Sequence, residues 1–326
     1  MSEPEGRSAT GDLDRRQFLA SALCASGGAA CAGAGAGGAG RVDGALLPTI
    51  PLGGYRVTRL ILGGNPIYGY SHFNRIYSQH LREYHTPERV VDLVRHAVRC
   101  GINTWQNSYT DRTVADVMRC REEGIEFNWL LLGKPDWYGR PEIIEKAAAY
   151  RPIGIAPHGA LAERLRREGR LSELRDMLKR IRDQGVLVGL SCHNPELIDL
   201  AEHEGWDVDY YMCALYYLTR PREEFRRILG EVPLGEIYLP SDRLRALKTV
   251  QAARKPCLVY KVLAAGRLNL SPTGVRRALH DTLAAIKPID AMIVGMFLEF
   301  EDQVAMNARF VREWHTTRAA GGGGSR

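Results

Sequence analysis

Lysines and histidines follow several short apolar runs of the sequence, at the point where each run ends. The lysines are Lys134 and Lys261, and the histidines are His158 and His193. A buried ammonium costs several kcal/mol unless it is paired or neutralised, so each lysine there needs a chemical reason. A desolvated lysine can form a Schiff base with a carbonyl compound, which makes Lys261 a candidate nucleophile. The structural alternative is a lysine whose stem lies against a rim while its ammonium reaches water.

Amide and aromatic side chains occupy equivalent positions after the other apolar runs. Two lysines and two histidines that converge with them would exceed what folding requires. The residues that we expect to bind a substrate are Asn65, His72, Gln106, Asn107, His193, Tyr216 and Lys261.

The apolar runs alternate with amphipathic helical patterns along the whole chain after residue 55. The eight runs cover residues 59–62, 102–105, 127–132, 152–156, 186–191, 209–214, 257–262 and 291–295. The helical patterns cover residues 87–100, 113–124, 141–150, 172–185, 195–205, 221–230, 241–254, 271–287 and 301–315. Such alternation is typical of a parallel sheet with helical crossovers. Eight units favour a single-domain (β/α)8 TIM barrel over residues 41–317, in which the residue after each strand points into the active-site mouth.

A long segment separates the first apolar run from the first helical pattern. It runs from Asn65 to Thr86 and contains several aromatic residues and histidines, among them His72. Most connections between a strand and a helix are far shorter, so we predict a loop that forms a lid over the substrate. The alternative is an ordered surface loop whose rings pack over the barrel mouth.

Several short motifs follow one another along the predicted barrel. They are Gly101-Ile102-Asn103-Thr104, Leu132-Gly133-Lys134, Ile155-Ala156-Pro157-His158, the strand from Gly185 to Ser191, Leu215-Tyr216-Tyr217-Leu218, the segment from Leu263 to Leu268, and Ile293-Val294-Gly295 with Asn307 beyond it. In this shared order they resemble the motifs of the aldo/keto reductase superfamily over nearly the whole barrel. The chain is therefore similar to a divergent member of that superfamily, which implies a (β/α)8 barrel that reduces carbonyl compounds with NADPH.

The resemblance also implies catalytic roles. In the family a tyrosine donates the proton, a lysine and an aspartate tune that tyrosine, and a histidine orients the carbonyl. Lys134 and His158 match the lysine and the histidine. The aspartate position is Gln106 and the tyrosine position is Asp111, while Tyr109 stands two residues earlier. Tyr109 or Asp111 would therefore replace the missing acid.

Cofactor contacts follow from the same resemblance. It implies that NADP or NAD is held by Ser191, Gly266, Gly295 and Asn307. Met296 and Phe297 follow Gly295, so the sequence has no basic residue there to bind a 2′-phosphate.

Three functions are compatible with these residues. The first is an aldo/keto reductase-like oxidoreductase with an incomplete catalytic tetrad, acting on a carbonyl or sugar-like small molecule. The second is a cofactor-free or metal-assisted lyase, isomerase or hydrolase on a sugar-like substrate. His158, His193, a loop histidine and Asp111 could hold a metal, but they form no compact ligand motif, so a metal is not expected. The third is a non-catalytic barrel that binds a ligand.

The first forty residues differ in composition from the rest of the chain. Asp14-Arg15-Arg16-Gln17-Phe18 is close to the twin-arginine export pattern, and an Ala- and Gly-rich run follows. This run has too few large apolar residues for a stable membrane span, so we predict a signal peptide over residues 1–40. The mature protein would then be periplasmic or otherwise extracytoplasmic, with the twin-arginine export machinery as a partner.

The remaining composition is that of an ordinary globular protein. The net charge is +6, and acidic and basic residues are interleaved, which indicates a solvated surface and no nucleic-acid partner. Five cysteines lie beyond the signal segment, and we predict buried free thiols. Residues 318–326 are predicted to be a disordered Gly-rich tail.

Overall fold

The computed structural model describes residues 44–137, 139–140 and 142–321. The predicted signal segment and the last five residues of the predicted tail lie outside the described residues, and both stay predictions. Helix α12 (Gln303–Gly321) continues past residue 318, so the tail was predicted to begin too early. No helix among the described residues is long and apolar enough to cross a membrane.

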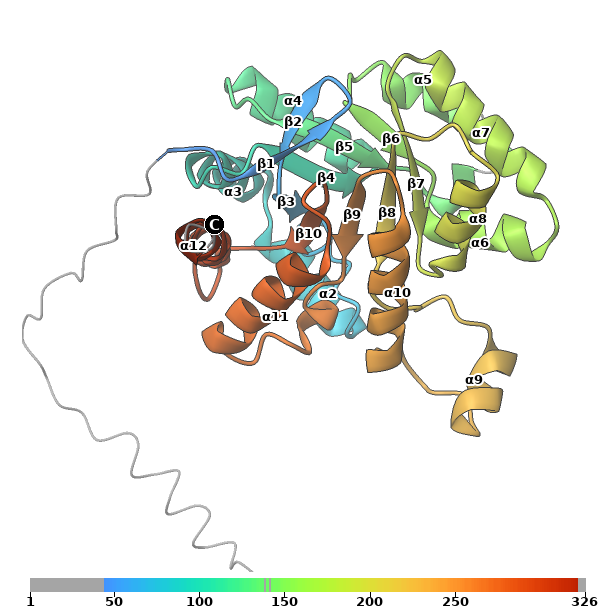
Figure 1. Cartoon of the computed structure of the whole chain (residues 1–326). Helices are drawn as coiled ribbons and strands as arrows, with labels where there is room; N and C mark the ends of the chain where they lie inside the picture. The colour runs from blue at the N-terminus through green and yellow to red at the C-terminus, as the bar shows by residue number, and fades with distance from the viewer. Residues whose placement is uncertain (1–43, 138, 141, 322–326) are drawn as a thin grey trace, which may run out of the picture. The chain divides into compact units, whose positions relative to one another are not determined.

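Eight parallel strands form a closed barrel with helices around it, which confirms the predicted (β/α)8 fold (Figure 1). Around the barrel the strand order is β10, β3, β4, β5, β6, β7, β8, β9. The strands are β3 (Leu60–Gly63), β4 (Thr104–Ser108), β5 (Asn128–Leu132), β6 (Gly154–Ala156), β7 (Leu187–Cys192), β8 (Tyr210–Ala214), β9 (Cys257–Tyr260) and β10 (Ala291–Gly295).

The helices follow the predicted order, with two additions. Helix α2 (Arg75–Tyr84) lies inside the segment predicted to be a loop, and the Asn74 side chain caps it by accepting a hydrogen bond from the Tyr77 amide. Helix α6 (Gly159–Arg167) was not predicted at all. The other helices are α3 (Pro87–Arg99), α4 (Asp111–Glu122), α5 (Glu142–Ala148), α7 (Leu171–Asp183), α8 (Glu196–His203), α9 (Arg222–Leu229), α10 (Pro240–Ala252) and α11 (Pro272–Ala285).

A hairpin that the sequence analysis missed precedes the barrel. Strands β1 (Thr49–Leu52) and β2 (Tyr55–Thr58) pair antiparallel. Ile50, Leu52 and Val57 from this hairpin are buried in one cluster with side chains of the barrel interior. That cluster includes residues near the amino ends of the strands, so the hairpin closes the end of the barrel opposite the predicted site.

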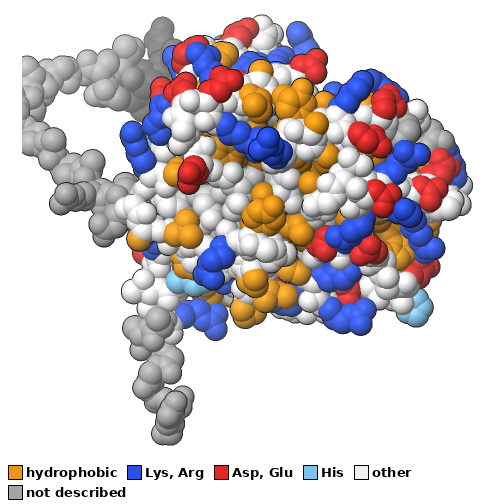
Figure 2. All heavy atoms as spheres, turned by 90° about the horizontal axis from the view of Figure 1, so that it is seen from above, with side chains coloured by type: hydrophobic (Ala, Val, Ile, Leu, Met, Phe, Trp, Pro, Cys, Tyr) orange, Lys and Arg blue, Asp and Glu red, His pale blue; other side chains and the backbone are white. Residues whose placement is uncertain are grey.

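The surface and the cysteines agree with the composition. On the face drawn in Figure 2, acidic and basic side chains are interspersed, as expected for a solvated surface. Cys100, Cys120, Cys192, Cys213 and Cys257 are buried free thiols, which confirms that prediction for the described residues.

A tyrosine fills the barrel interior where two neighbouring strands carry glycine. A Cβ atom at Gly189 would lie 2.4 Å from Cζ of Tyr210, and one at Gly154 would lie 3.0 Å from its hydroxyl. Tyr210 is fully buried, so its ring cannot move into solvent to make room.

We therefore expect Gly189→Ala to destabilise the protein by about 1–3 kcal/mol, because it overpacks the interior against a rigid ring. Urea unfolding followed by circular dichroism measures the change. Gly54→Ala is the control, because a Cβ there meets no atom within 4 Å. Equal effects of the two substitutions would contradict the packing argument.

Candidate active site

A cavity of about 450 Å³ opens at the carboxyl ends of the strands. It brings together residues that are more than two hundred positions apart in the sequence, such as Asn65 and Gly295. Ten predicted site residues line it: Asn65, His72, Gln106, Lys134, His158, Ser191, His193, Lys261, Gly266 and Gly295.

Lys261 enters the cavity through an unusual backbone turn. Tyr260 ends β9 and also lines the cavity, and side chains of consecutive strand residues normally point to opposite faces. Lys261 has a φ of 62°, in the left-handed region that costs a non-glycine residue about 1–3 kcal/mol. The turn directs Lys261 into the mouth instead of outward toward the helices.

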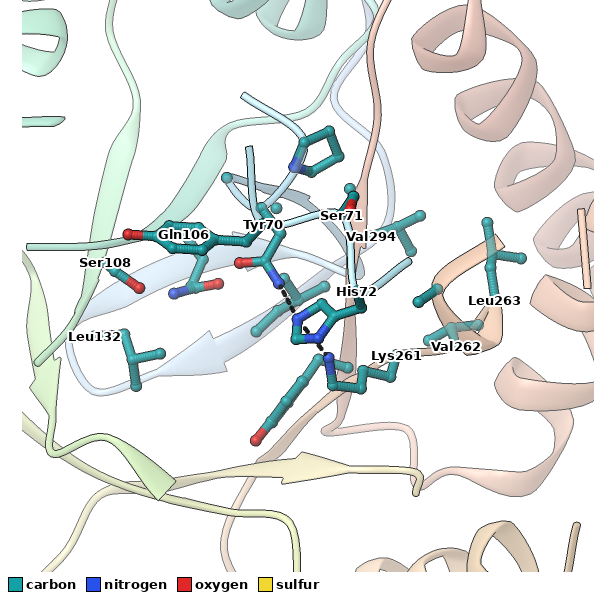
Figure 3. Close-up of a pocket in the computed structure, with 18 of the residues that line it drawn as sticks. Tyr70, Ser71, His72, Gln106, Ser108, Leu132, Lys261, Val262, Leu263 and Val294 are labelled. Carbon is teal, nitrogen blue, oxygen red and sulfur yellow. Dashed lines mark hydrogen bonds between the residues drawn. The ribbon is translucent and has the colours of Figure 1, made fainter. Parts of the chain in front are cut away.

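His72 and Glu236 form a hydrogen-bonded chain with Lys261. The Lys261 Nζ lies 2.9 Å from His72 Nε2, and His72 Nδ1 lies 2.8 Å from a Glu236 oxygen. Figure 3 shows His72 and Lys261 pointing toward each other within the pocket. Since a carboxylate only accepts, Nδ1 carries the proton that His72 donates to Glu236, and in the neutral ring Nε2 accepts.

Further contacts stabilise this hydrogen-bonded chain of Lys261, His72 and Glu236. Asn65 Nδ2 lies 3.2 Å from the same His72 Nε2, and the Tyr238 hydroxyl donates to Glu236 at 2.9 Å. The Arg267 guanidinium lies over the Tyr238 ring, 4.2 Å from its centroid. These contacts hold the loop that carries His72 against the segment after α9.

The charge state of Lys261 depends on this environment. Burial lowers the pKa of Lys261 to about 8, with Glu236 opposing the decrease and Arg267 adding to it. About a tenth of the amine is therefore neutral and nucleophilic at pH 7, far more than of an ordinary lysine.

His158 is held as a neutral hydrogen-bond donor. It caps α6, because its Nδ1 accepts a hydrogen bond from the Ala160 amide at 3.1 Å. Burial, followed by the neighbouring charge of His193, lowers the pKa of His158 to about 4. The proton of the neutral ring therefore resides on Nε2, where it can be donated to a ligand oxygen.

Glu163 anchors His193 from inside the protein. Its carboxylate accepts hydrogen bonds from the amides of His193 and Asn194 and from the Thr219 hydroxyl. The Nδ1 atom of His193 lies 3.8 Å from Glu163 Oε1. Burial would raise the pKa of Glu163, but the contacts with His193, Thr219 and the Asn194 amide hold it below its ordinary value.

Three predicted substrate- or cofactor-binding residues lie outside the cavity lining. Asn107 faces the helices, because β4 extends to Ser108 and its alternation places Gln106 inside, and Asn107 accepts a hydrogen bond from Trp129 at 2.7 Å. Tyr216 packs edge-on against Tyr238, with ring centroids 5.1 Å apart. Asn307 is buried in α12. These placements correct the expectation that they line the mouth.

The two candidates for the missing acid are also outside the lining. Tyr109 packs edge-on against Trp137, with centroids 5.6 Å apart, and no hydrogen bond joins it to Lys134 among the described residues. Burial raises the pKa of Tyr109, the opposite of what a tuned proton donor requires. Asp111 is exposed in the first turn of α4, where a carboxylate suits the helix dipole. The aldo/keto reductase tetrad is therefore not assembled by these residues.

Several site residues escaped the sequence analysis. Ser108, Tyr260 and Asn269 line the cavity, and strand alternation would have identified the first two once the strand ends were known. Glu163 and Glu236 were also missed. They contact His193 and His72, and no local sequence pattern identifies either glutamate.

The residues do not fit a nicotinamide nucleotide held as the resemblance implies. Asn307 is 1% exposed, and a Cβ on Gly295 would lie 2.6 Å from Cδ of Pro66, so a proline ring already occupies the space beside that glycine. Met296 and Phe297 are buried and offer no charge. Among the described residues, no group of three or more His, Cys, Asp and Glu side chains is arranged to hold a metal ion.

Comparisons with known proteins identify no family for this chain. No family model and no curated protein matches the chain. It is similar to a truncated 3-deoxy-D-arabino-heptulosonate 7-phosphate synthase from Thermotoga maritima (14% identity, TM-score 0.49, covering 85% of this chain and 94% of that one). It is also similar to the glycerol dehydrogenase AKR11B4 from Gluconobacter oxydans (11%, 0.46, 84% and 95%) and to a dihydropteroate synthase from Xanthomonas albilineans (14%, 0.46, 84% and 98%). Such distant likenesses carry no argument about the reaction, and membership of the aldo/keto reductase superfamily stays a prediction.

Proposed function

We propose that the protein is an enzyme that forms an imine between Lys261 and a small carbonyl compound and then acts on that compound as a lyase or isomerase. The observation that carries the proposal is the position of the Lys261 amine, inside the cavity and 2.9 Å from His72 Nε2. An amine is the nucleophile of choice for carbonyl carbon, and His72 is placed to accept and return its proton.

The first step needs no cofactor. The neutral amine attacks the carbonyl carbon, a C–N bond forms, and the carbonyl π electrons move to oxygen. His72 Nε2 takes a proton from nitrogen and returns it to that oxygen, which later leaves as water. One amine, one carbonyl and one solvent proton thus give one iminium ion and one water, while His158 Nε2–H stabilises the oxygen as its charge develops.

The iminium then withdraws electrons from the adjacent carbon. A C–H bond there can break, with its proton going to a base and its electron pair forming an enamine, and return of the proton to a different carbon completes an isomerisation. Alternatively, a C–C bond at that carbon can break: its electron pair forms the enamine, and the other fragment leaves as a carbonyl compound after giving a proton to the base, which is lysis. Protonation of the enamine and hydrolysis of the iminium by water then release the product and restore the lysine. We assign the base to His193, because it lines the cavity and has Glu163 behind its Nδ1. The neutral His158, whose Nε2 carries the proton, is not suited to that role.

Trapping with cyanoborohydride tests the proposal. The protein is incubated with a panel of small aldehydes and ketones and sodium cyanoborohydride, which reduces an iminium to a stable secondary amine. We expect an intact-mass adduct that peptide mapping assigns to Lys261. An absence of adduct with every compound, or an adduct confined to Lys134, would overturn the proposal.

The pH dependence of labelling should shift in opposite directions in two variants. In the unsubstituted protein the labelling rate should rise with pH and level off above about pH 8, as Lys261 loses its proton. Glu236→Gln keeps an acceptor for His72 but removes the charge that raises the pKa of Lys261, so the rise should move to lower pH. Arg267→Met removes a charge that lowers that pKa, so the rise should move to higher pH. Shifts in the same direction would contradict the assignment of the titrating group to Lys261.

The reductase reaction is a second candidate, favoured by one observation. Lys134 and His158 match the catalytic lysine and histidine of the aldo/keto reductases, and both line the same cavity. A bound nicotinamide would supply the hydride. Its binding would have to use contacts other than Gly295 and Asn307. A thermal shift with millimolar NADPH or NADH tests it, since a ligand of the native state raises the melting temperature.

A further inference from the structure

The cavity carries positive charge with no acidic residue in its lining. Lys134 and Lys261 both line it, and no Asp or Glu is among the described lining residues. A cavity of this sign attracts anions and disfavours cations.

The two lysines stand on opposite sides of the mouth. Lys134 follows β5 and Lys261 follows β9, and in the closed order of eight strands these two are four positions apart in either direction. Figure 3 agrees with this placement: Leu132, at the end of β5, and Ser108 lie across the pocket from Lys261, with His72 between them.

The two ammonium groups differ in their partners. The charge of Lys261 is balanced through His72 by Glu236. Lys134 forms no ion pair with a carboxylate within residues 44–137, 139–140 and 142–321. An ammonium at the wall of a cavity, opposite the nucleophile and without a protein counter-ion, is a site for a negative group on the ligand.

We propose that the substrate is an oxo acid, whose carbonyl carbon reacts at Lys261 while its carboxylate binds Lys134 across the mouth. This inference rests on the proposed imine chemistry and adds the substrate class to it. Ser108 and Gln106 lie on β4, next to β5, where Ser108 is paired in register with Leu132. Both line the cavity and can donate hydrogen bonds to the same carboxylate.

A carboxylate fits these surroundings better than a phosphate does. Much of the remaining lining is apolar, including Leu132, Met212, Ile293 and Phe297. No arginine is among the described lining residues, and a phosphate dianion in such a place needs several charged or backbone donors. One ammonium with a hydroxyl and an amide matches the single charge of a carboxylate.

Matched pairs of carbonyl compounds test the substrate class. Cyanoborohydride labelling of the full chain is measured as a function of the concentration of each carbonyl compound. Pyruvate is compared with hydroxyacetone, and levulinate is compared with 2-pentanone. We expect each oxo acid to reach half-maximal labelling at a concentration about tenfold lower than its neutral counterpart, as one charge-assisted contact provides. Dihydroxyacetone phosphate serves as the phosphate-bearing probe and should label less readily than the oxo acids.

Variants at Lys134 assign the effect to that residue. Lys134→Met and Lys134→Gln should abolish the preference for the oxo acid, and Lys134→Arg should retain it. Lys248→Met, at an exposed position of α10, is the matched control and should keep the preference. Equal labelling by acid and neutral compounds, a preference that survives both Lys134→Met and Lys134→Gln, or strongest labelling by the phosphate would overturn the inference while leaving the imine proposal intact. A complete absence of labelling would overturn the proposed function itself.

Discussion

Lys261→Met is expected to abolish covalent trapping and to lower turnover by about a thousandfold or more, because no other group at this point can form the C–N bond. Methionine keeps an unbranched side chain of similar length, so the cavity wall is preserved. Lys261→Arg should be equally inactive, since a guanidinium stays protonated at every accessible pH and cannot act as the nucleophile.

Intact-mass spectrometry after cyanoborohydride treatment measures the effect in parallel with turnover. Lys248→Met controls for the loss of one surface amine, and it should trap substrate as the unsubstituted protein does. Persistence of an adduct in Lys261→Met, or its transfer to Lys134, would show that Lys261 is not the nucleophile.

Lys261→Met should not lower the stability of the protein, although it removes the activity. Desolvation lowers the pKa of Lys261, which means that the fold works against its charged form. An apolar side chain at this position removes that cost, so thermal unfolding of Lys261→Met should occur at the same temperature as in the unsubstituted protein or above it. A loss of activity without a loss of stability is the pattern expected of a functional group held at some cost to the fold.

The barrel was predictable because its evidence is local and repeated. Strand and helix patterns alternate eight times, and few architectures accommodate such alternation in one domain. The same logic placed Lys134, His158, His193 and Lys261 at one cavity, since the carboxyl ends of parallel strands meet at one end of a barrel. The hairpin β1–β2 and helices α2 and α6 were missed.

The direction in which a strand side chain points depends on where the strand begins and ends. The sequence did not define those ends. The strand predicted over residues 102–105 is found at Thr104–Ser108, so Asn107 lies within the strand and faces outward. A side chain changes face with each residue of a strand, so an error in where a strand ends can misplace its polar residues.

Long-range partners were beyond sequence reasoning. Glu236 meets His72 across 164 positions of the chain, and Glu163 reaches His193 from a helix that was not predicted. Nothing in the local pattern around either glutamate distinguishes it from the many charged residues on the helices. Their roles follow from tertiary placement alone.

Glu163→Ala is expected to destabilise the protein by about 3–5 kcal/mol, the cost of leaving buried polar groups without a charged partner. Two backbone amides and the Thr219 hydroxyl would lose their acceptor, and Glu163 is 3% exposed, so water has little access to replace it. Because the substitution also releases the loop that carries His193, activity should fall with stability.

Glu163→Gln separates the structural role from the chemical one. The amide oxygen can still accept from the two backbone amides, and the amide nitrogen can donate to the Thr219 oxygen, so the loss of stability should be only about 1–2 kcal/mol. The carboxylate 3.8 Å from His193 Nδ1 is removed, however, so proton transfer by His193 should slow by about tenfold to a hundredfold. Glu126→Gln, at an exposed position, is the control.

The loss of stability at acidic pH provides an independent measurement of the Glu163 charge. The folded-state pKa of Glu163 lies below its ordinary value, so its contribution is present above the unfolded-state pKa and is lost as pH falls through the folded-state pKa. Glu163→Gln has no such group to protonate, and its stability should decline less steeply than that of the unsubstituted protein in this window. Urea unfolding at a series of pH values measures both slopes. Identical slopes for the two proteins would contradict an ionised Glu163. A shallower slope for Glu163→Gln, together with slower turnover, would assign two roles to this buried carboxylate: it anchors the loop that carries His193, and it activates the His193 imidazole.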